Sequence, residues 1–216
     1  MTTRDTLAVA QQIVRDIDMY AATVRRKGLT VYLAGPAVFL PCAADEGADL
    51  CAIAARYGFK SRFPLDPATD VCGVRSPKFR TVAAAIAYGN EEADRIKDSC
   101  LAHIKACDLL IADVSPFRGP GADGGTAFEM GFMSALGKPV FAWSMASDQR
   151  YADRISERID ILHDGDGLLI ENLGLTDNVH IARSPADGQV HACFEDACGS
   201  AAAWFAGGGG NEGGWS

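Results

Sequence analysis

The regular alternation of short apolar runs with helix-like stretches constrains the fold of this chain more than any other feature. The apolar runs, each expected to be a strand, occupy residues 30–34, 59–63, 109–113 and 140–143. Stretches with helical periodicity separate them, at 43–57, within about 80–106 and after Gly125. Strands that alternate with helices form βαβ units and a mostly parallel sheet. We therefore predict an α/β protein with about five parallel strands.

The two ends of the chain differ from this pattern. Residues 6–27 carry apolar side chains at three-and-four spacing, which predicts an amphipathic helix that ends at Gly28. This helix either covers a face of the sheet or joins subunits. The last ten residues, 207–216, are rich in glycine and are expected to form a flexible tail. The predicted division is a helix at 1–28, a catalytic domain at 29–206 and the tail.

Composition excludes several classes of function. With 28 Asp and Glu against 20 Lys and Arg, the net charge is −8, so we expect no nucleic-acid partner. No apolar run approaches the roughly 18 residues of a membrane span, and the first 20 residues lack the apolar core of a signal peptide, so a cytoplasmic protein without membrane contact is expected. The seven cysteines form no CxxC pair, which argues against a disulfide framework and a zinc site. No metal or cofactor is expected.

Three motifs follow the predicted strands. YLAGPAVF includes the end of the first strand, PLD follows the second, and DVSPFRGPGADGGTAFEMG extends from the end of the third. In parallel sheets ligands bind outside the carboxyl ends of the strands, where such loops meet. The motifs are therefore candidates for one shared site.

The third motif contains the residues that point most directly to chemistry. Asp123 precedes two glycines, as a residue that caps a helix would, and Glu129 falls in the early turns of that helix. The helix dipole there favours an ionised carboxylate, which is suited to attack an electrophilic sugar carbon. Phe128 and Met130 flank Glu129, so a packed neighbourhood is expected. The alternative is that Asp123 only caps the helix and Glu129 is a solvated surface residue.

These motifs, together with LGLTDNVHIA at 173–182, resemble the nucleoside 2-deoxyribosyltransferase family, in particular its members with a Ser-Pro-Phe-Arg-Gly loop. The resemblance covers roughly residues 30–182 in the same order. It implies a flavodoxin-like, Rossmann-like three-layer fold with helices on both faces of the sheet. It also implies transfer of 2-deoxyribose between bases through a covalent glycosyl-enzyme ester.

The resemblance assigns roles to three residues. Glu129 would be the nucleophile, Asp123 would hold the sugar 5′-hydroxyl, and Tyr32 would orient the Glu129 carboxylate with its phenol. A half-buried strand tyrosine with some other partner is the alternative for Tyr32. Gly35 and Gly125 in the same motifs would bring the backbone close to the substrate.

The base pocket is expected to involve aromatic and polar loop residues. Phe39, or the neighbouring Val38, would stack on the base, although a plain core phenylalanine is nearly as well supported. Phe117 and Arg118 lie in the loop after the third strand, where Arg118 could close the site, recognise the base or form only a surface ion pair. Asp66 is either a base-pocket acceptor or a loop cap.

Two further positions follow from the resemblance. Asn178 matches an asparagine that family members contribute to a neighbouring subunit's site, which predicts a homo-oligomer; a turn-forming role is the alternative. Cys100 stands where the family has an Asp or Asn that assists the leaving base. A thiol is a weak donor, so we expect Cys100 to be a wall of the pocket. Asp98 is expected to face solvent.

The predicted reaction is base exchange between a nucleoside and a free nucleobase. Hydrolysis of (deoxy)nucleosides or nucleotides uses the same residues, with water in place of the incoming base. Asp123 would repel a phosphate, which favours an unphosphorylated nucleoside. A catalytically silent nucleoside- or nucleotide-binding module is the second alternative, indicated only by Cys100.

Overall fold

A single parallel sheet organises the computed structural model, which describes residues 3–64 and 81–208. Its strands are β1 (Thr30–Ala34), β2 (Lys60–Arg62), β3 (Leu109–Asp113), β4 (Val140–Trp143) and β5 (Val190–His191). They lie in the order β2-β1-β3-β4-β5, and all neighbours are parallel. This is the flavodoxin-like order, so the predicted fold class is confirmed.

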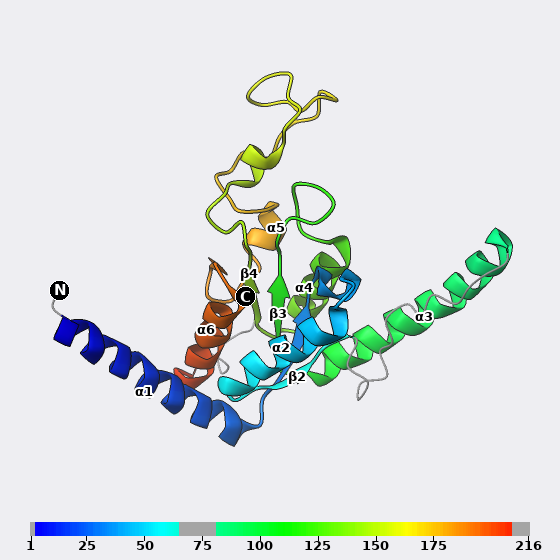
Figure 1. Cartoon of the computed structure of the whole chain (residues 1–216). Coiled ribbons are helices and arrows are strands. Elements are labelled where there is room, and N and C mark those ends of the chain that lie inside the picture. Colours follow the sequence, from blue (N-terminus) through cyan, green and yellow to red (C-terminus); the bar gives the residue numbers. More distant parts are fainter. Residues whose placement is uncertain (1–2, 65–80, 209–216) are drawn as a thin grey trace.

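Helices cover both faces of this sheet (Figure 1). They are α1 (Thr3–Lys27), α2 (Ala43–Arg56), α3 (Val82–Ala106), α4 (Gly124–Ala135), α5 (Val179–Ala182) and α6 (Phe194–Ala206), with short 3-10 helices η1 (Pro36–Phe39) and η3 (Tyr151–Arg154). Buried residues of α1, α2 and α6 share one core cluster with the sheet, and those of α3 and α4 share another. The fold therefore has three layers.

Alternation along the strands divides the side chains between these two clusters. In β1, Val31 and Leu33 point to the α2 and α6 face, whereas Tyr32 and Ala34 point to the α3 and α4 face. All four are buried, as expected for a strand in the interior of a parallel sheet.

The C-terminal half of α1 packs against α6. Val24 is fully buried in the core of that face, and Lys27 Nζ donates to the Phe205 carbonyl at 2.8 Å. The preceding turns project from the body (Figure 1), and Ile13 and Val14 are exposed there. Of the two roles open for this helix, covering a face of the sheet is the one that its second half has, through its packing beside α6.

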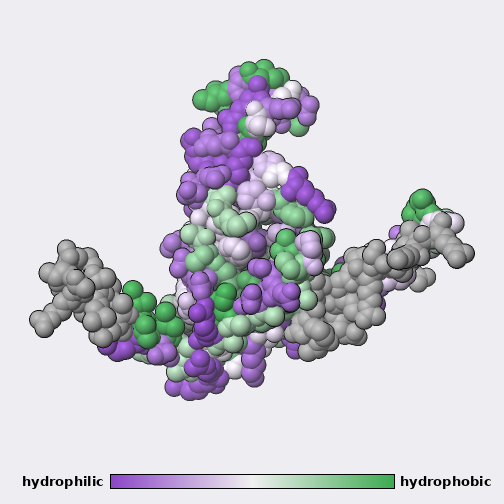
Figure 2. Space-filling model, viewed as in Figure 1, coloured by the Kyte–Doolittle hydropathy of each residue, from purple (hydrophilic) through white to green (hydrophobic). Residues whose placement is uncertain are grey.

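A second projection is the arm, residues 155–170, which follows η3 and contains two isolated antiparallel bridges. Apolar side chains gather at its tip (Figure 2). The arm residues with large exposed apolar side chains are Ile159, Ile161, Leu162, Leu168 and Leu169. Exposed apolar side chains gathered in one place are typical of a surface that contacts another molecule.

The last strand and helix were not predicted individually. Phe194, Ala197, Cys198, Ala201 and Phe205 of α6 are buried at helical spacing, so the periodicity that identifies the helix was present in the sequence. In residues 3–64 and 81–208, no helix is long and apolar enough to cross a membrane, and the cysteines form no disulfide.

Candidate active site

The crevice of this fold lies where β1 and β3 end side by side. The chain leaves β1 toward α2 on one face and leaves β3 toward α4 on the other, so the connecting loops separate at this point. A Cβ on Gly35 would lie 2.8 Å from the Asp113 Cβ, so only glycine allows the two strand ends to approach this closely. Ligands of doubly wound sheets bind at such a switch point.

Tyr32 and Glu129 meet on the α3 and α4 side of the sheet. Tyr32 is fully buried on β1, and its hydroxyl donates to Glu129 Oε1 at 2.7 Å. Glu129 reaches the bond from the second turn of α4 and is half-buried. Residues 97 positions apart in the sequence thus form one polar pair inside an apolar layer.

Burial dominates the electrostatics of Glu129. Desolvation raises the pKa of its carboxyl to about 7, the Tyr32 hydrogen bond opposes this, and the nearby charge of Asp123 adds to the rise. Burial thus opposes the ionisation that the position of Glu129 near the helix terminus was expected to favour. A carboxyl that titrates near neutral pH is typical of catalytic sites.

Cys100 on α3 joins the same pair from a third element. A hydrogen bond links its thiol to the Tyr32 hydroxyl, and Glu129 is close enough to act on it electrostatically. Burial raises the pKa of the thiol, so it remains protonated at neutral pH. Asp98 faces solvent as expected, and lies 3.4 Å from Lys97 Nζ.

Asp123 is the N-cap of α4. Its Oδ2 accepts from the Thr126 backbone N–H at 3.0 Å and from the Thr126 hydroxyl at 3.2 Å. A Cβ on Gly125 would lie 3.0 Å from the same oxygen. The capping role is thus present, and it uses one carboxylate oxygen. Beside it, Met130 is buried but Phe128 is 58% exposed, so the packed neighbourhood of Glu129 is one-sided.

The loops after β1 and β3 meet in a cluster of two aromatic rings and a guanidinium, those of Phe39, Phe117 and Arg118. The two rings stack with centroids 5.2 Å apart, and the Arg118 guanidinium lies 4.7 Å from the Phe117 ring centroid and 5.1 Å from that of Phe39. Arg118 has φ 54°, a left-handed conformation that costs a non-glycine residue free energy. Strain of this kind is concentrated at ligand-binding loops.

A cavity of about 350 Å³ lies beside this cluster, on the α2 and α6 face. Gly35 and Phe117 line it, with Glu46, Asp113 and Trp143. Burial raises the pKa of Asp113, while the Ser115 backbone N–H donates to its Oδ1 at 2.9 Å. Tyr32 and Glu129 are not among the residues that line this cavity, so the predicted site residues are divided between the two sides of β1 and β3.

Asn178 is engaged within its own chain. Its Oδ1 accepts from the His180 N–H at 3.0 Å as the N-cap of α5, and its amide donates to Glu171 Oε2 at 2.6 Å. Asp66 lies outside the described residues. In the part of the chain that the structure describes, no group of three or more His, Cys, Asp or Glu could hold a metal ion.

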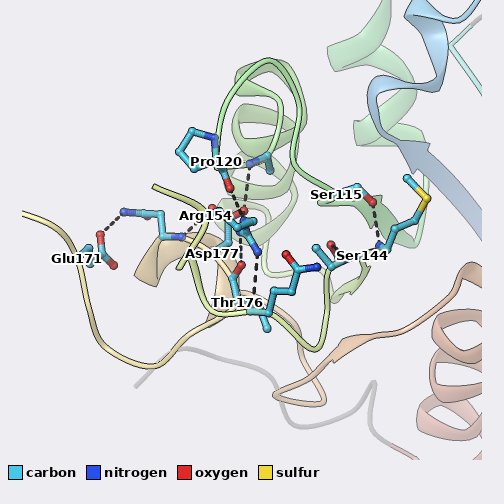
Figure 3. A network of polar contacts seen from close by, with 12 residues as sticks. Ser115, Pro120, Ser144, Arg154, Glu171, Thr176 and Asp177 are labelled. Carbon is cyan, nitrogen blue, oxygen red and sulfur yellow. Dashed lines mark hydrogen bonds and ion pairs between the residues drawn. The ribbon is translucent and has the colours of Figure 1, made fainter. Parts of the chain in front are cut away.

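Sequence reasoning missed a buried network next to the site (Figure 3). Arg154 and Asp177 form an ion pair with Nη2 and Oδ2 3.6 Å apart, and their side chains are only 9% and 2% exposed. The one local signal was Thr176-Asp177-Asn178, which indicates a turn and gives no hint of burial.

Comparisons with known proteins identify the family and agree with the fold. The sequence model of the family described as nucleoside 2-deoxyribosyltransferase matches residues 31–180. The structure is similar to that of a 2-deoxyribosyltransferase from Leishmania mexicana, with a TM-score of 0.61 and 28% identity over 81% of this chain and 97% of that one. An uncharacterised protein of Schizosaccharomyces pombe is 28% identical over 69% of this chain and 73% of its own length.

Proposed function

Because the chain belongs to the nucleoside 2-deoxyribosyltransferase family, we propose that it exchanges the base of 2-deoxyribonucleosides through an ester on Glu129. The observation that carries the proposal is the hydrogen bond between Tyr32 on β1 and Glu129 on α4. A carboxyl oriented by one donor, with the pKa near 7, can act as a nucleophile at neutral pH.

The reaction takes two steps. The ionised Glu129 attacks C1′ of the sugar, a C1′–O bond forms, the C1′–N glycosidic bond breaks, and the base leaves with the electron pair and takes up a proton. The nitrogen of a second base then attacks C1′, the ester bond breaks, and Glu129 regains its carboxylate as the incoming base loses a proton. The Tyr32 hydroxyl holds Oε1, which orients the carboxyl for attack in both directions.

The other predicted residues bind the substrate. Asp123 caps α4 through Oδ2, which leaves Oδ1 to accept from the sugar 5′-hydroxyl. Its charge disfavours a 5′-phosphate, so the substrate is an unphosphorylated nucleoside. The Phe39, Phe117 and Arg118 cluster offers planar groups on which a base stacks. Gly35 and Gly125 allow the backbone close approach, and Cys100 borders the Tyr32–Glu129 pair.

Self-association is part of the proposal. Exposed apolar side chains on the arm, on the first half of α1 and at Phe128 on α4 support it. In the assembled protein, Asn178 would complete a neighbour's site, which requires it to leave Glu171.

The test starts from the wild-type protein with 2′-deoxyinosine and adenine. Chromatography should show 2′-deoxyadenosine, and mass spectrometry of quenched mixtures should show a deoxyribosyl adduct on the peptide that contains Glu129. Hypoxanthine without a new nucleoside would identify a hydrolase, and no loss of nucleoside over several substrates would identify a silent binding module. Glu129→Ala should remove product and adduct together, and Asp98→Asn, an exposed carboxylate on α3, is the control.

A further inference from the structure

Arg154 connects its own segment to two others that are distant in sequence. Its Nε donates to the Pro120 carbonyl at 2.7 Å, and its Nη2 donates to the Thr176 carbonyl at 2.5 Å. A longer bond of 3.4 Å joins Nη1 to the Gln149 carbonyl. Arg154 itself ends η3, so its side chain connects η3 to the loop before α4 and to the segment before α5 (Figure 3).

Asp177 completes the connection from the other side. Its Oδ2 accepts from the Ala122 N–H at 3.0 Å, and its Oδ1 accepts from the Asn178 N–H at 2.7 Å. Gly121 passes so close that a Cβ there would lie 3.3 Å from Oδ1. Both oxygens of a nearly inaccessible carboxylate are thus bound to backbone, which is the pattern of a structural rather than a reactive group.

These contacts end one residue before Asp123. Pro120 and Ala122 are bound by Arg154 and Asp177, and Asp123 follows as the N-cap of α4. A shift of residues 120–122 would therefore move the Asp123 carboxylate relative to Glu129. Small displacements of substrate-holding groups reduce rates strongly even when the moved residue is remote from the chemistry.

We propose that Arg154 and Asp177 are positioning residues that fix Asp123 for recognition of the sugar. The proposal rests on the proposed function for the identity of the group that Asp123 binds, the 5′-hydroxyl. In this proposal Arg154 and Asp177 do not contact the substrate, and they act on Asp123 through the backbone of residues 120–122, which they bind directly.

The test compares Arg154→Lys with Arg150→Lys. Lysine retains the charge but cannot reach two carbonyls with a planar fork. Arg150 lies on the same turn but forms an exposed ion pair with Asp153. With 2′-deoxyadenosine as donor, Arg154→Lys should lower kcat/KM about tenfold, the effect of one lost hydrogen bond to substrate. With 2′,5′-dideoxyadenosine, which lacks the 5′-hydroxyl, the loss should be less than about twofold relative to wild type.

A merely structural role gives a different result. In that case Arg154→Lys would lower the active fraction and reduce kcat equally for the two nucleoside donors, and this result would overturn the inference. Wild-type kinetics of Arg154→Lys with both nucleosides would also overturn it. Hydrogen exchange gives a readout independent of activity: the Ala122 amide should exchange faster in Arg154→Lys than in Arg150→Lys. If the wild-type protein is inactive, the proposed function fails, and this exchange then decides the inference alone. Faster exchange at Ala122 supports positioning of the loop, and unchanged exchange overturns it.

Discussion

Glu129 and Asp177 are two carboxylates that folding removes from water, and they are satisfied to different degrees. Asp177 has both oxygens bound to backbone N–H groups and an arginine beside it. Among the described residues, Glu129 has one donor, the Tyr32 hydroxyl, and the charge of Asp123 nearby opposes its ionisation. Desolvation raises both pKa values, but only at Asp177 do backbone donors and a cation counter the rise. The comparison separates a carboxylate held for structure from one left available for chemistry.

Replacement of Glu129 by glutamine should remove the reactivity that distinguishes Glu129 from Asp177. Glu129→Gln retains the shape but cannot form the ester, so base exchange should fall on the order of 10³-fold or more. Because the folded pKa, about 7, lies above the unfolded value of 4.5, the ionised carboxyl destabilises the fold, with the full cost above pH 7 and none below pH 4.5. The melting temperature of Glu129→Gln at pH 8 should therefore equal or exceed that of the wild type. A base-exchange rate of Glu129→Gln within tenfold of the wild-type rate would contradict the assignment of Glu129 as the nucleophile.

The same isosteric change at Asp177 should act on stability. Asp177→Asn leaves the Arg154 charge buried without its partner and turns an NH₂ group toward a backbone donor, which should cost about 3 kcal/mol of unfolding free energy. Urea denaturation measures this. Asp153→Asn, in the exposed pair with Arg150, should change the value by less than about 0.5 kcal/mol. Equal losses in the two variants would show that burial of the pair is unimportant.

Removal of the Tyr32 hydroxyl, which donates to Glu129, sharpens the contrast between the two carboxylates. Wild-type kcat/KM should rise with pH through about 7 as Glu129 ionises. Tyr32→Phe should lower the plateau about 30-fold, because a hydrogen bond to a charged group is lost. It should also shift the rising limb to higher pH, since the Tyr32 hydrogen bond lowers the Glu129 pKa. Tyr57→Phe, at the end of α2, should alter neither. An unshifted limb would exclude Tyr32 from control of this carboxyl.

The smallest effect is expected at Cys100. Its thiol is a weak donor that burial keeps protonated, so Cys100→Ala should change kcat/KM less than about threefold. Base-exchange rates with adenine and with cytosine as acceptors measure this. Cys193→Ala, at the start of α6, is the control. A loss of tenfold or more would make the thiol a participant and would weaken the view that Glu129 depends on Tyr32 alone.

Local pattern was sufficient for much of the fold. The strands at 30–34, 109–113 and 140–143 have the predicted bounds, because buried parallel strands are continuous apolar runs that end at turn or cap residues. The region 59–63 gave only the three-residue β2. The two-residue β5 is too short to produce a pattern of its own. Capping of α4 by Asp123 was likewise a local prediction, since a capping residue contacts only the next turn.

The candidate site likewise contains some features that the sequence predicted and others that only the structure shows. Resemblance in sequence brought Tyr32, Asp123 and Glu129 together, and the structure places the first and last in a hydrogen bond. The stacking of Phe39 on Phe117 and the left-handed Arg118 could not be predicted, since they depend on how two loops meet. Asn178 was assigned either to a neighbour's site or to a turn, and within the single chain its side chain bonds to Glu171 and to the His180 N–H.

By itself, the sequence determined the alternation of strands and helices, and therefore a parallel sheet with its motifs at one edge. Tertiary structure alone decided that Glu129 titrates near neutral pH and that Arg154 and Asp177 hold the loop before Asp123. The reason is physical. Apolar periodicity is a property of neighbours along the chain, whereas desolvation and buried ion pairs sum contributions from segments that only folding brings into contact.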